Sequence, residues 1–332
     1  MISMAIDLSI VIPFYNDTHK VRLCLDSIER AMSKLPDTMP APEIIVVDDH
    51  SPVPFDPGDF SLKVFCRRME QNRGVGAARN LGARLSRGSH ILFIDSDVVL
   101  GDDHLLRLYG HLMEKKGPII QGPTSRIPAN DPGSLFHHYL AVSWNFYQHE
   151  NWQISVFTQC FAIEKVFFNN LGGFSEHFAR SGGEEFELGL RLAKKKADSI
   201  FFDPDLIHFH HSEDLFKRLK KVYFRSRHIR KIALDMPNLP FRFTAQALMR
   251  SSFAFALDAS VLLCLSSPLA GAGSYGLCAV LFYFADDALS KQMRKHHSLH
   301  LAMLSVVFRQ LEYTFINLGM LKALCTGKSH DR

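Results

Sequence analysis

Asp95 and Asp97 are the residues of this chain whose types and spacing most directly suggest chemistry. They stand one residue apart, directly after the apolar run Ile91-Leu92-Phe93-Ile94. Two carboxylates at the exit of a buried strand form a site for a hard divalent cation such as Mg²⁺ or Mn²⁺, which keeps open positions for phosphate oxygens. The competing interpretation is a solvated turn after a strand, so the pair needs support from other segments.

The elements that must position this pair are predicted from the alternation of apolar runs along the chain. The predicted elements are strands over 8–13, 43–47, 62–65 and 91–94, and helices over 18–34 and 74–85. This alternation is typical of a parallel, doubly wound α/β sheet. Acidic residues follow successive strands: Asp17 comes after the first, and Asp48 and Asp49 after the second. Open α/β sheets bind ligands beyond the carboxyl ends of their strands, so a crevice for nucleotide and metal is expected there.

Four sequence motifs accompany this pattern, and a fifth, acidic stretch follows later in the chain. They are VIPFYND (11–17), VVDDHS (46–51), NRGVGAARN (72–80), DSD (95–97) and GGEEFEL (182–188). In order and spacing they resemble the family 2 glycosyltransferases of GT-A fold over about residues 7–215. The resemblance implies a Rossmann-like, mostly parallel sheet with helices on both faces. It also implies a nucleotide-diphospho-sugar donor and inversion at the anomeric carbon.

The resemblance implies roles in binding the nucleotide sugar for eleven residues. They are Pro13, Tyr15, Asn16, Asp17, Asp48, Asp49, Arg73, Gly74, Arg79, Asp95 and Ser96. Tyr15 can stack on a base, and a carboxylate such as Asp49 can accept from the N–H edge of uracil or guanine. Arg73 and Arg79 can contact pyrophosphate. The alternative for Arg79 is a helix-surface residue paired with an acid.

The resemblance also implies a metal site, a general base and an acceptor side. Asp97, with Asp95, would hold Mg²⁺ or Mn²⁺, and the spacing from Pro204 favours His210 over His208 and His211 as a third ligand. Glu185 stands where the family has its general base, usually an Asp. We place Gly172, Gly173, Phe174 and Glu184 on the acceptor side. The alternative for the glutamates is an acid-rich helix N-terminus favoured by the helix dipole.

Composition narrows the class of protein. The chain has 332 residues, 47% hydrophobic and 22% charged, which excludes disordered and fibrous proteins. Its six cysteines are dispersed without a CxxC pair, so neither a disulfide framework nor a structural zinc is expected. Residues 217–231 contain eight Lys or Arg and no acid, a pattern that suits an anionic lipid surface. No nucleic-acid motif accompanies these cations, so nucleic acid is not an expected partner.

The C-terminal part is apolar and is expected to be helical. Residues 259–285 contain no charged side chain, but Pro268 and three glycines interrupt them, so we predict two apolar arms at about 247–266 and 274–288. Leu299–Leu321 is predicted to be an interfacial amphipathic helix. We therefore divide the chain into a GT-A domain (1–215, with a nucleotide half at about 7–100 and an acceptor half at about 101–215), a basic amphipathic linker (216–245) and a membrane-associated hairpin with a terminal helix (246–332). The alternative is a buried helical subdomain or a dimer interface.

These observations predict an inverting glycosyltransferase of hexosyltransferase type. It would transfer a single sugar to a lipid-linked saccharide or polyprenyl acceptor at the cytoplasmic face of the inner membrane, for surface-glycan assembly. The chain lacks the QxxRW motif of the family's processive synthases. Two alternatives stay open: a soluble oligomeric glycosyltransferase acting on protein or a small acceptor, and a catalytically silent membrane-attached scaffold. The donor, the linkage and the choice between a spanning and a dipping hairpin are not set by the sequence, and neither is the oligomeric state.

Overall fold

The computed structural model describes residues 7–58, 60, 62–151, 156–176, 184–195, 199–235, 241–285 and 287–326. The chain forms two compact units. The first consists of Met1–Asn130 with Tyr147–Ser212, and the second of Asp131–Phe146 with Glu213–Arg332. The predicted domain end at 215 lies close to the end of the first unit. Residues 131–146, which the sequence analysis placed in the acceptor half, belong instead to the second unit.

The first unit is built on a seven-stranded sheet in the order β3-β2-β1-β4-β7-β6-β8. Its strands are β1 (Leu8–Phe14), β2 (Glu43–Asp48), β3 (Val64–Arg68), β4 (His90–Ile94), β6 (Ile119–Gln121), β7 (Cys160–Glu164) and β8 (Ile200–Phe202). All neighbours pair in parallel except at β7, which is antiparallel to both β4 and β6. Two further strands, β5 (Val98–Leu100) and β9 (His208–His210), form a separate antiparallel pair. The predicted α/β architecture with a mostly parallel sheet is confirmed.

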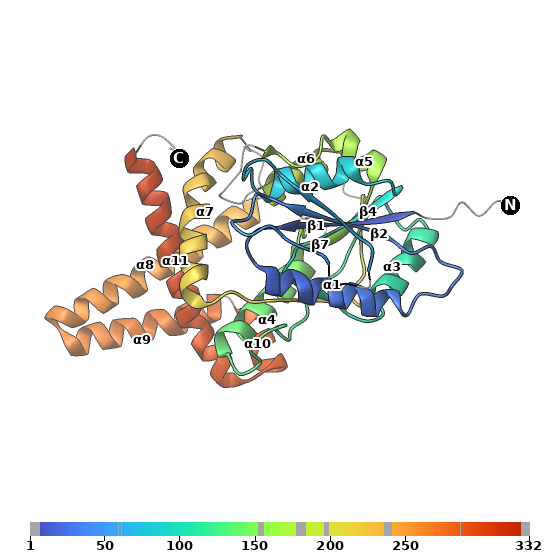
Figure 1. The fold of residues 1–332 in the computed structure, drawn as a ribbon. Helices are drawn as coiled ribbons and strands as arrows, with labels where there is room; N and C mark the ends of the chain where they lie inside the picture. The colour runs from blue at the N-terminus through green and yellow to red at the C-terminus, as the bar shows by residue number, and fades with distance from the viewer. Residues whose placement is uncertain are drawn as a thin grey trace. The chain divides into compact units, whose positions relative to one another are not determined.

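Helices cover both faces of this sheet (Figure 1). The helices α1 (Thr18–Met32) and α3 (His104–Met113) pack on one face, and α2 (Val75–Leu85), α5 (Lys165–Leu171) and α6 (Glu184–Lys195) pack on the other. The strand β1 is completely buried, as its unbroken apolar run predicts for a central parallel strand. Gly82 of α2 lies so close to β1 that a Cβ there would come within 2.2 Å of Val11 Cγ1, so α2 is held tightly over the strand ends.

The second unit is helical. It contains the first part of α4 (Leu135–Asn151) together with α7 (Leu215–Asp235), α8 (Phe241–Ser266), α9 (Pro268–Ala285), α10 (Asp287–His296) and α11 (Leu299–Thr326). The predicted linker at 216–245 therefore lies mostly within α7, and the two predicted apolar arms correspond to α8 and α9. Among the described residues one helix segment, Met249–Ser266, is long and apolar enough to cross a membrane, and there are two if the bent pair α9–α10 counts as one span.

Candidate active site

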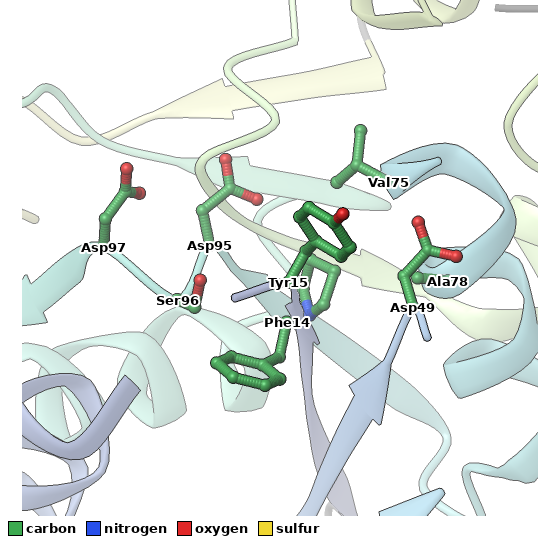
Figure 2. A pocket seen from close by; sticks show the side chains of 9 residues that line it. Phe14, Tyr15, Asp49, Val75, Ala78, Asp95, Ser96 and Asp97 are labelled. Atoms are coloured by element: carbon green, nitrogen blue, oxygen red, sulfur yellow. The ribbon is translucent and has the colours of Figure 1, made fainter. Parts of the chain in front are cut away.

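A cavity of about 200 Å³ opens at the carboxyl ends of β1, β2 and β4, beside the N-terminus of α2. Figure 2 shows Asp95, Ser96 and Asp97 on one side of it, Tyr15 in the middle, and Asp49 with Val75 and Ala78 on the other side. Its lining residues are Pro13, Phe14, Tyr15, Asp49, Val75, Ala78, Asp95, Ser96 and Asp97. The structure therefore brings together residues from all four N-terminal motifs, at the place where an open α/β sheet binds its ligand.

The two aspartates of the DSD motif have different partners. Asp95 follows the last residue of β4, and its Oδ1 accepts from Arg79 Nη2 at 2.5 Å. Asp97 Oδ1 lies 3.4 Å from His210 Nε2. The pairing of β5 with β9 explains this approach, because Val98 stands opposite His210 in that ladder. A residue more than a hundred positions away is thereby brought to the DSD turn.

The other two histidines of that segment point elsewhere. His208 is fully buried, where its Nε2 lies 3.2 Å from Thr124 Oγ1, and burial holds its pKa well below the usual value. His211 is buried at the other end of the segment, and its backbone N–H donates to the carbonyl of Asp97 at 2.9 Å. Burial also lowers the pKa of His211. Of the three histidines, His210 is the one whose side chain pairs with a DSD carboxylate.

Whether these residues fit a divalent cation follows from their donor atoms. The carboxylates of Asp95 and Asp97 are both partly open to solvent, and one oxygen of Asp95 already accepts from Arg79. Within the described ranges no group of three or more His, Cys, Asp or Glu side chains is placed to hold a metal ion. This donor set suits an ion that takes one or two protein carboxylates and obtains its other ligands from phosphate and water, as Mg²⁺ and Mn²⁺ do.

Asp49 lies at the far side of the cavity and organises the loop before α2. Its Oδ1 accepts from the backbone N–H of Arg73 at 2.7 Å, and its Oδ2 from that of Gly74 at 2.8 Å. Gly74 has φ 86°, a conformation that favours glycine. Burial raises the pKa of Asp49 despite these two bonds. Asp49 therefore both lines the cavity and fixes the start of α2.

Several of the predicted donor-binding residues do not line the cavity in the structure. Asp48 is buried beside the cavity, where it accepts from Arg68 Nη1 and from the N–H of Ser51, both at 2.8 Å. Asp17 caps α1 by accepting from the N–H of Lys20. None of Asp48, Asp17 and Asn16 is a lining residue. The carboxylates of Asp48 and Asp17 cap a turn and a helix end, which sequence motifs do not distinguish from ligand contacts.

Arg79 is also outside the lining, and it is buried within the protein. Its side chain is 2% exposed and contacts two acids, Asp95 at 2.5 Å and Glu184 Oε1 at 3.3 Å. The guanidinium also lies 5.1 Å from the centre of the Phe174 ring. Burial disfavours the charged form, but the two carboxylates outweigh it and raise the pKa of Arg79. The alternative interpretation was an arginine on the helix surface that pairs with an acid. The pairing is confirmed, but Arg79 is buried and not on the helix surface.

The segment 172–174, which was predicted to lie on the acceptor side, contacts α2 through Asn80. Asn80 donates to the carbonyl of Phe174 at 2.9 Å and accepts from the N–H of Phe174 at the same distance. Phe174 is buried against three other rings, those of Phe93, Phe161 and Phe168. Gly172 and Gly173 have φ values of 87° and 69° at the end of α5. Phe174 is thus a core residue, and its placement on the acceptor side stays a prediction.

Two acids that support the site follow this segment. Glu176 accepts from Arg73 Nη2 at 2.5 Å and from Asn80 Nδ2 at 3.0 Å, so both arginines of the NRGVGAARN motif have carboxylate partners. Glu184 begins α6 and is buried against Arg79. The sequence analysis missed Glu176 entirely, because an isolated acid in a loop gives no periodic or motif signal.

Glu185 stands beside Glu184 in the first turn of α6, where the helix dipole favours a negative charge. It is half-buried, and its carboxylate is close enough to Arg79 to raise the pKa of that guanidinium. Arg79 therefore connects the DSD turn with the helix that carries the predicted general base. The Gly182-Gly183 pair of the acidic motif lies outside the described residues.

The chain matches two family models, "Glycosyl transferase family 2" over residues 9–168 and "Glycosyl transferase family group 2" over residues 90–289. The second covers more than half of the chain. The chain belongs to the family 2 glycosyltransferases. This confirms the family that the motifs indicated, and with it the prediction of a glycosyltransferase.

Two similar curated proteins are bacterial glycosyltransferases. The chain is 34% identical over 144 residues to the poly(ribitol-phosphate) beta-glucosyltransferase of Bacillus spizizenii, which aligns with 39% of this chain and 21% of that protein. It is 26% identical over 166 residues to glycosyltransferase GlyA of Streptococcus pneumoniae, with 48% of this chain and 22% of that protein aligned. The chain spans about a fifth of the length of these two relatives.

One similar solved structure is the mannosyltransferase PcManGT from Pyrobaculum calidifontis, in complex with GDP-Man and Mn²⁺. The TM-score is 0.54 at 16% identity, and the match covers 98% of this chain and 89% of that one. At this identity the likeness concerns the fold, and it agrees with the GT-A architecture predicted from the motifs.

Proposed function

We propose that this chain is an inverting, metal-dependent glycosyltransferase that transfers a single sugar from a nucleotide-diphospho-sugar to a saccharide acceptor in surface-glycan assembly. One observation carries the proposal. The cavity at the strand ends combines two partly open carboxylates, Asp95 and Asp97, with a tyrosine ring that is 52% exposed. A nucleoside diphosphate needs a flat apolar surface for its base and a cation site for its phosphates, and this cavity has groups for both.

In this proposal the donor lies across the cavity from Asp49 to Asp97. Tyr15 presents its ring to the base, and Asp49 is placed at the same end with lone pairs left after its two backbone bonds. The N-terminus of α2 begins at Gly74 beside the cavity, so its free N–H groups favour a negatively charged ligand there. The family membership and the GDP-Man and Mn²⁺ bound by PcManGT support a nucleotide-sugar donor with a divalent cation.

The cation would be held by Asp97, with Asp95 and His210 beside it. When bound, such an ion neutralises the charge that develops on the departing diphosphate. The residues of the chain set up that position: Arg79 holds the Asp95 carboxylate in place, and the β5–β9 ladder holds His210 next to Asp97. In this proposal the ion takes its protein ligands from Asp97 and Asp95, and His210, which lies 3.4 Å from Asp97 Oδ1, stands beside them.

Glu185 is the general base in this proposal. It accepts the proton of the acceptor hydroxyl as that oxygen forms a bond to the anomeric carbon of the donor. The bond from the anomeric carbon to the phosphate oxygen breaks at the same time, its electron pair leaves with the nucleoside diphosphate, and the anomeric configuration inverts. The longer side chain of Glu185, compared with the usual Asp, is accommodated at the beginning of α6, where Glu184 anchors the helix to Arg79.

We further propose that the acceptor is lipid-linked and that the chain works at the cytoplasmic face of the inner membrane. The curated relatives include enzymes whose names specify poly(ribitol-phosphate), a surface polymer substrate, which supports a surface-glycan role but not a particular lipid. The second unit supports the membrane location, because its helices expose many large apolar side chains.

The test of this function is a comparison of Glu185→Gln with Glu187→Gln. Glu187 lies on the same helix, and its carboxylate pairs with Arg191 at 2.6 Å, so its substitution matches the charge change without touching the predicted base. We expect Glu185→Gln to bind the nucleotide sugar normally and to lose transfer by a factor of about 10²–10⁴. Glu187→Gln should keep most of its transfer activity. Near-normal turnover of Glu185→Gln would show that the base is another residue.

A further inference from the structure

One face of helix α11 packs against the other helices of the second unit. Glu312 accepts from Arg218 Nε of α7 at 2.5 Å and from the hydroxyl of Tyr139 of α4 at 2.6 Å. Gly319 lies so close to α7 that a Cβ there would come 2.0 Å from Ser226 Oγ. The two acids facing Arg218 raise its pKa despite its burial, so one of the eight cations of the basic segment is internal rather than on a surface.

A different face of α11 carries the hairpin formed by α8 and α9. Gln310 and Thr314 donate to the Asp258 carboxylate of α8, at 3.0 and 2.7 Å. Gln310 also accepts from the hydroxyl of Tyr275 of α9 at 2.8 Å. The hairpin is therefore attached near the middle of α11 by partly buried polar bonds, and it extends from there away from the helix (Figure 1).

The face that carries the hairpin is apolar and exposed on both sides of the attachment. The exposed side chains are Leu299, Met303 and Val307 before it, and Leu318 and Leu321 after it. With Gln310 and Thr314 they recur at intervals of three and four residues, so all lie along one stripe of the helix. A stripe of this kind is unfavourable in water, and it points to the same side as the hairpin.

The hairpin itself becomes more apolar and more exposed towards its tip. Leu265 and Leu269, on either side of the turn between α8 and α9, are 85% and 90% exposed. From Asp258 to the end of α8 at Ser266 is eight residues, or about 12 Å of helix. The hydrocarbon core of a bilayer is about 30 Å thick. The free part of the hairpin thus reaches most of the way through one leaflet, about 15 Å of hydrocarbon, and is too short to cross the membrane.

Cations stand next to this apolar surface in the chain. Lys291, Arg294 and Lys295 of α10 are exposed, and α10 connects the end of α9 with the start of the stripe at Leu299. Cations at the edge of an apolar surface match the anionic headgroups that border the acyl region of a bilayer. A second copy of the same basic surface would repel them instead.

We propose that α11 lies flat in the boundary between headgroups and acyl chains of an anionic membrane, with the α8–α9 tip inserted into one leaflet without crossing it. All backbone groups of the inserted part are within helices or their tight connection, as the bilayer interior requires. This inference deepens the proposed membrane location of the enzyme, and it rests on that part of the proposed function.

Vesicle flotation of the full-length protein tests the docking surface. The vesicles are phosphatidylcholine, with or without phosphatidylglycerol, and the variant is Leu265→Glu/Leu269→Glu. We expect the wild type to prefer the anionic vesicles, and the double variant to bind them about a hundredfold more weakly. The matched control is Val166→Glu, at an exposed position of α5 in the first unit, which should bind as the wild type does.

The depth of insertion is read from the fluorescence of Leu269→Trp, made in a Trp144→Phe/Trp152→Phe background. We expect strong quenching by lipids brominated in the middle of the acyl chain, and none by iodide trapped inside the vesicles. Quenching by internal iodide would mean a spanning hairpin and would overturn the proposal. Two other results would also overturn the proposal. One is a double variant that still floats with the anionic vesicles. The other is a wild-type protein that is a dimer without lipid and a double variant that is a monomer. Binding of the nucleotide sugar, measured on the same variants, separates these failures from a failure of the proposed function.

Discussion

Replacing Arg79 by methionine is the perturbation that distinguishes two accounts of this site. In the structure Arg79 is buried and pairs with Asp95 at 2.5 Å and with Glu184 at 3.3 Å. The variant leaves the Glu184 carboxylate buried without its cationic partner, and Asp95 loses its shortest bond. Removing one partner of a buried ion pair costs about 3–5 kcal/mol. In a domain of this size that loss lowers the melting temperature by about 10 °C.

The assay is thermal or denaturant unfolding of Arg79→Met, Glu184→Gln and the double variant. Because the double variant has neither the buried cation nor the buried anion, we expect it to recover much of the stability that Arg79→Met loses. The cycle of variants then gives a coupling energy between the two residues. An arginine whose role is to contact pyrophosphate would give the opposite result. Unchanged stability of Arg79→Met together with a large loss of donor affinity would refute our account of Arg79.

Two further predictions concern titratable groups of the first unit. Bonds from Arg107 and His111 outweigh the effect of burial and lower the pKa of Asp203 to about 2. In the unfolded chain the pKa is about 3.9, so the ionised Asp203 stabilises the fold above that pH. This stabilisation is lost as the pH falls from about 3.9 towards 2. Asp203→Asn should therefore lose about 2 kcal/mol of unfolding free energy at pH 7 and show a weaker acid dependence in urea titrations; an unchanged midpoint would contradict this. Burial lowers the pKa of His104 to about 4, so the unfolded chain takes up its proton first and stability falls as pH drops from about 6.5 to 4. Between pH 7 and pH 5, protonation of His104 in the unfolded chain lowers the unfolding free energy by about 2 kcal/mol. In the same titrations the unfolding free energy of His104→Gln should therefore depend less steeply on pH. An equal dependence in both proteins would show that His104 does not titrate as inferred.

The sequence predicts the nucleotide half of the fold well, because its strands are continuous apolar runs and its helices have clear periodicity. The run at 8–13 and the structure's β1 differ by one residue, and Asp95 directly follows β4 as predicted. The convergence of Tyr15, Asp49 and Asp97 on one cavity follows from parallel strands, whose carboxyl ends share an edge.

What the sequence could not predict depends on contacts between distant segments. Nothing local shows that Arg79 is buried between Asp95 and Glu184, since a charged residue in a helix is usually at the surface. Likewise, an aspartate after a strand can bind a ligand or cap a turn, and only the bond from the N–H of Ser51 shows that Asp48 caps a turn. The reversed direction of β7, which inserts between β4 and β6, is also set by tertiary pairing and not by its apolar pattern.

The central claim is that the cavity binds a nucleotide sugar through a cation held at the DSD turn. The most direct measurement is the melting temperature of the full-length protein with each common nucleotide sugar, with and without Mn²⁺. A donor present at a hundred times its dissociation constant adds about 2.7 kcal/mol to the unfolding free energy, which raises the midpoint by several degrees. We predict such a shift for one donor, in Mn²⁺ only. It should be absent from Asp97→Ala and retained in Asp103→Ala, which removes an exposed carboxylate outside the cavity. No shift with any donor, or an equal shift in Asp97→Ala, would contradict the account.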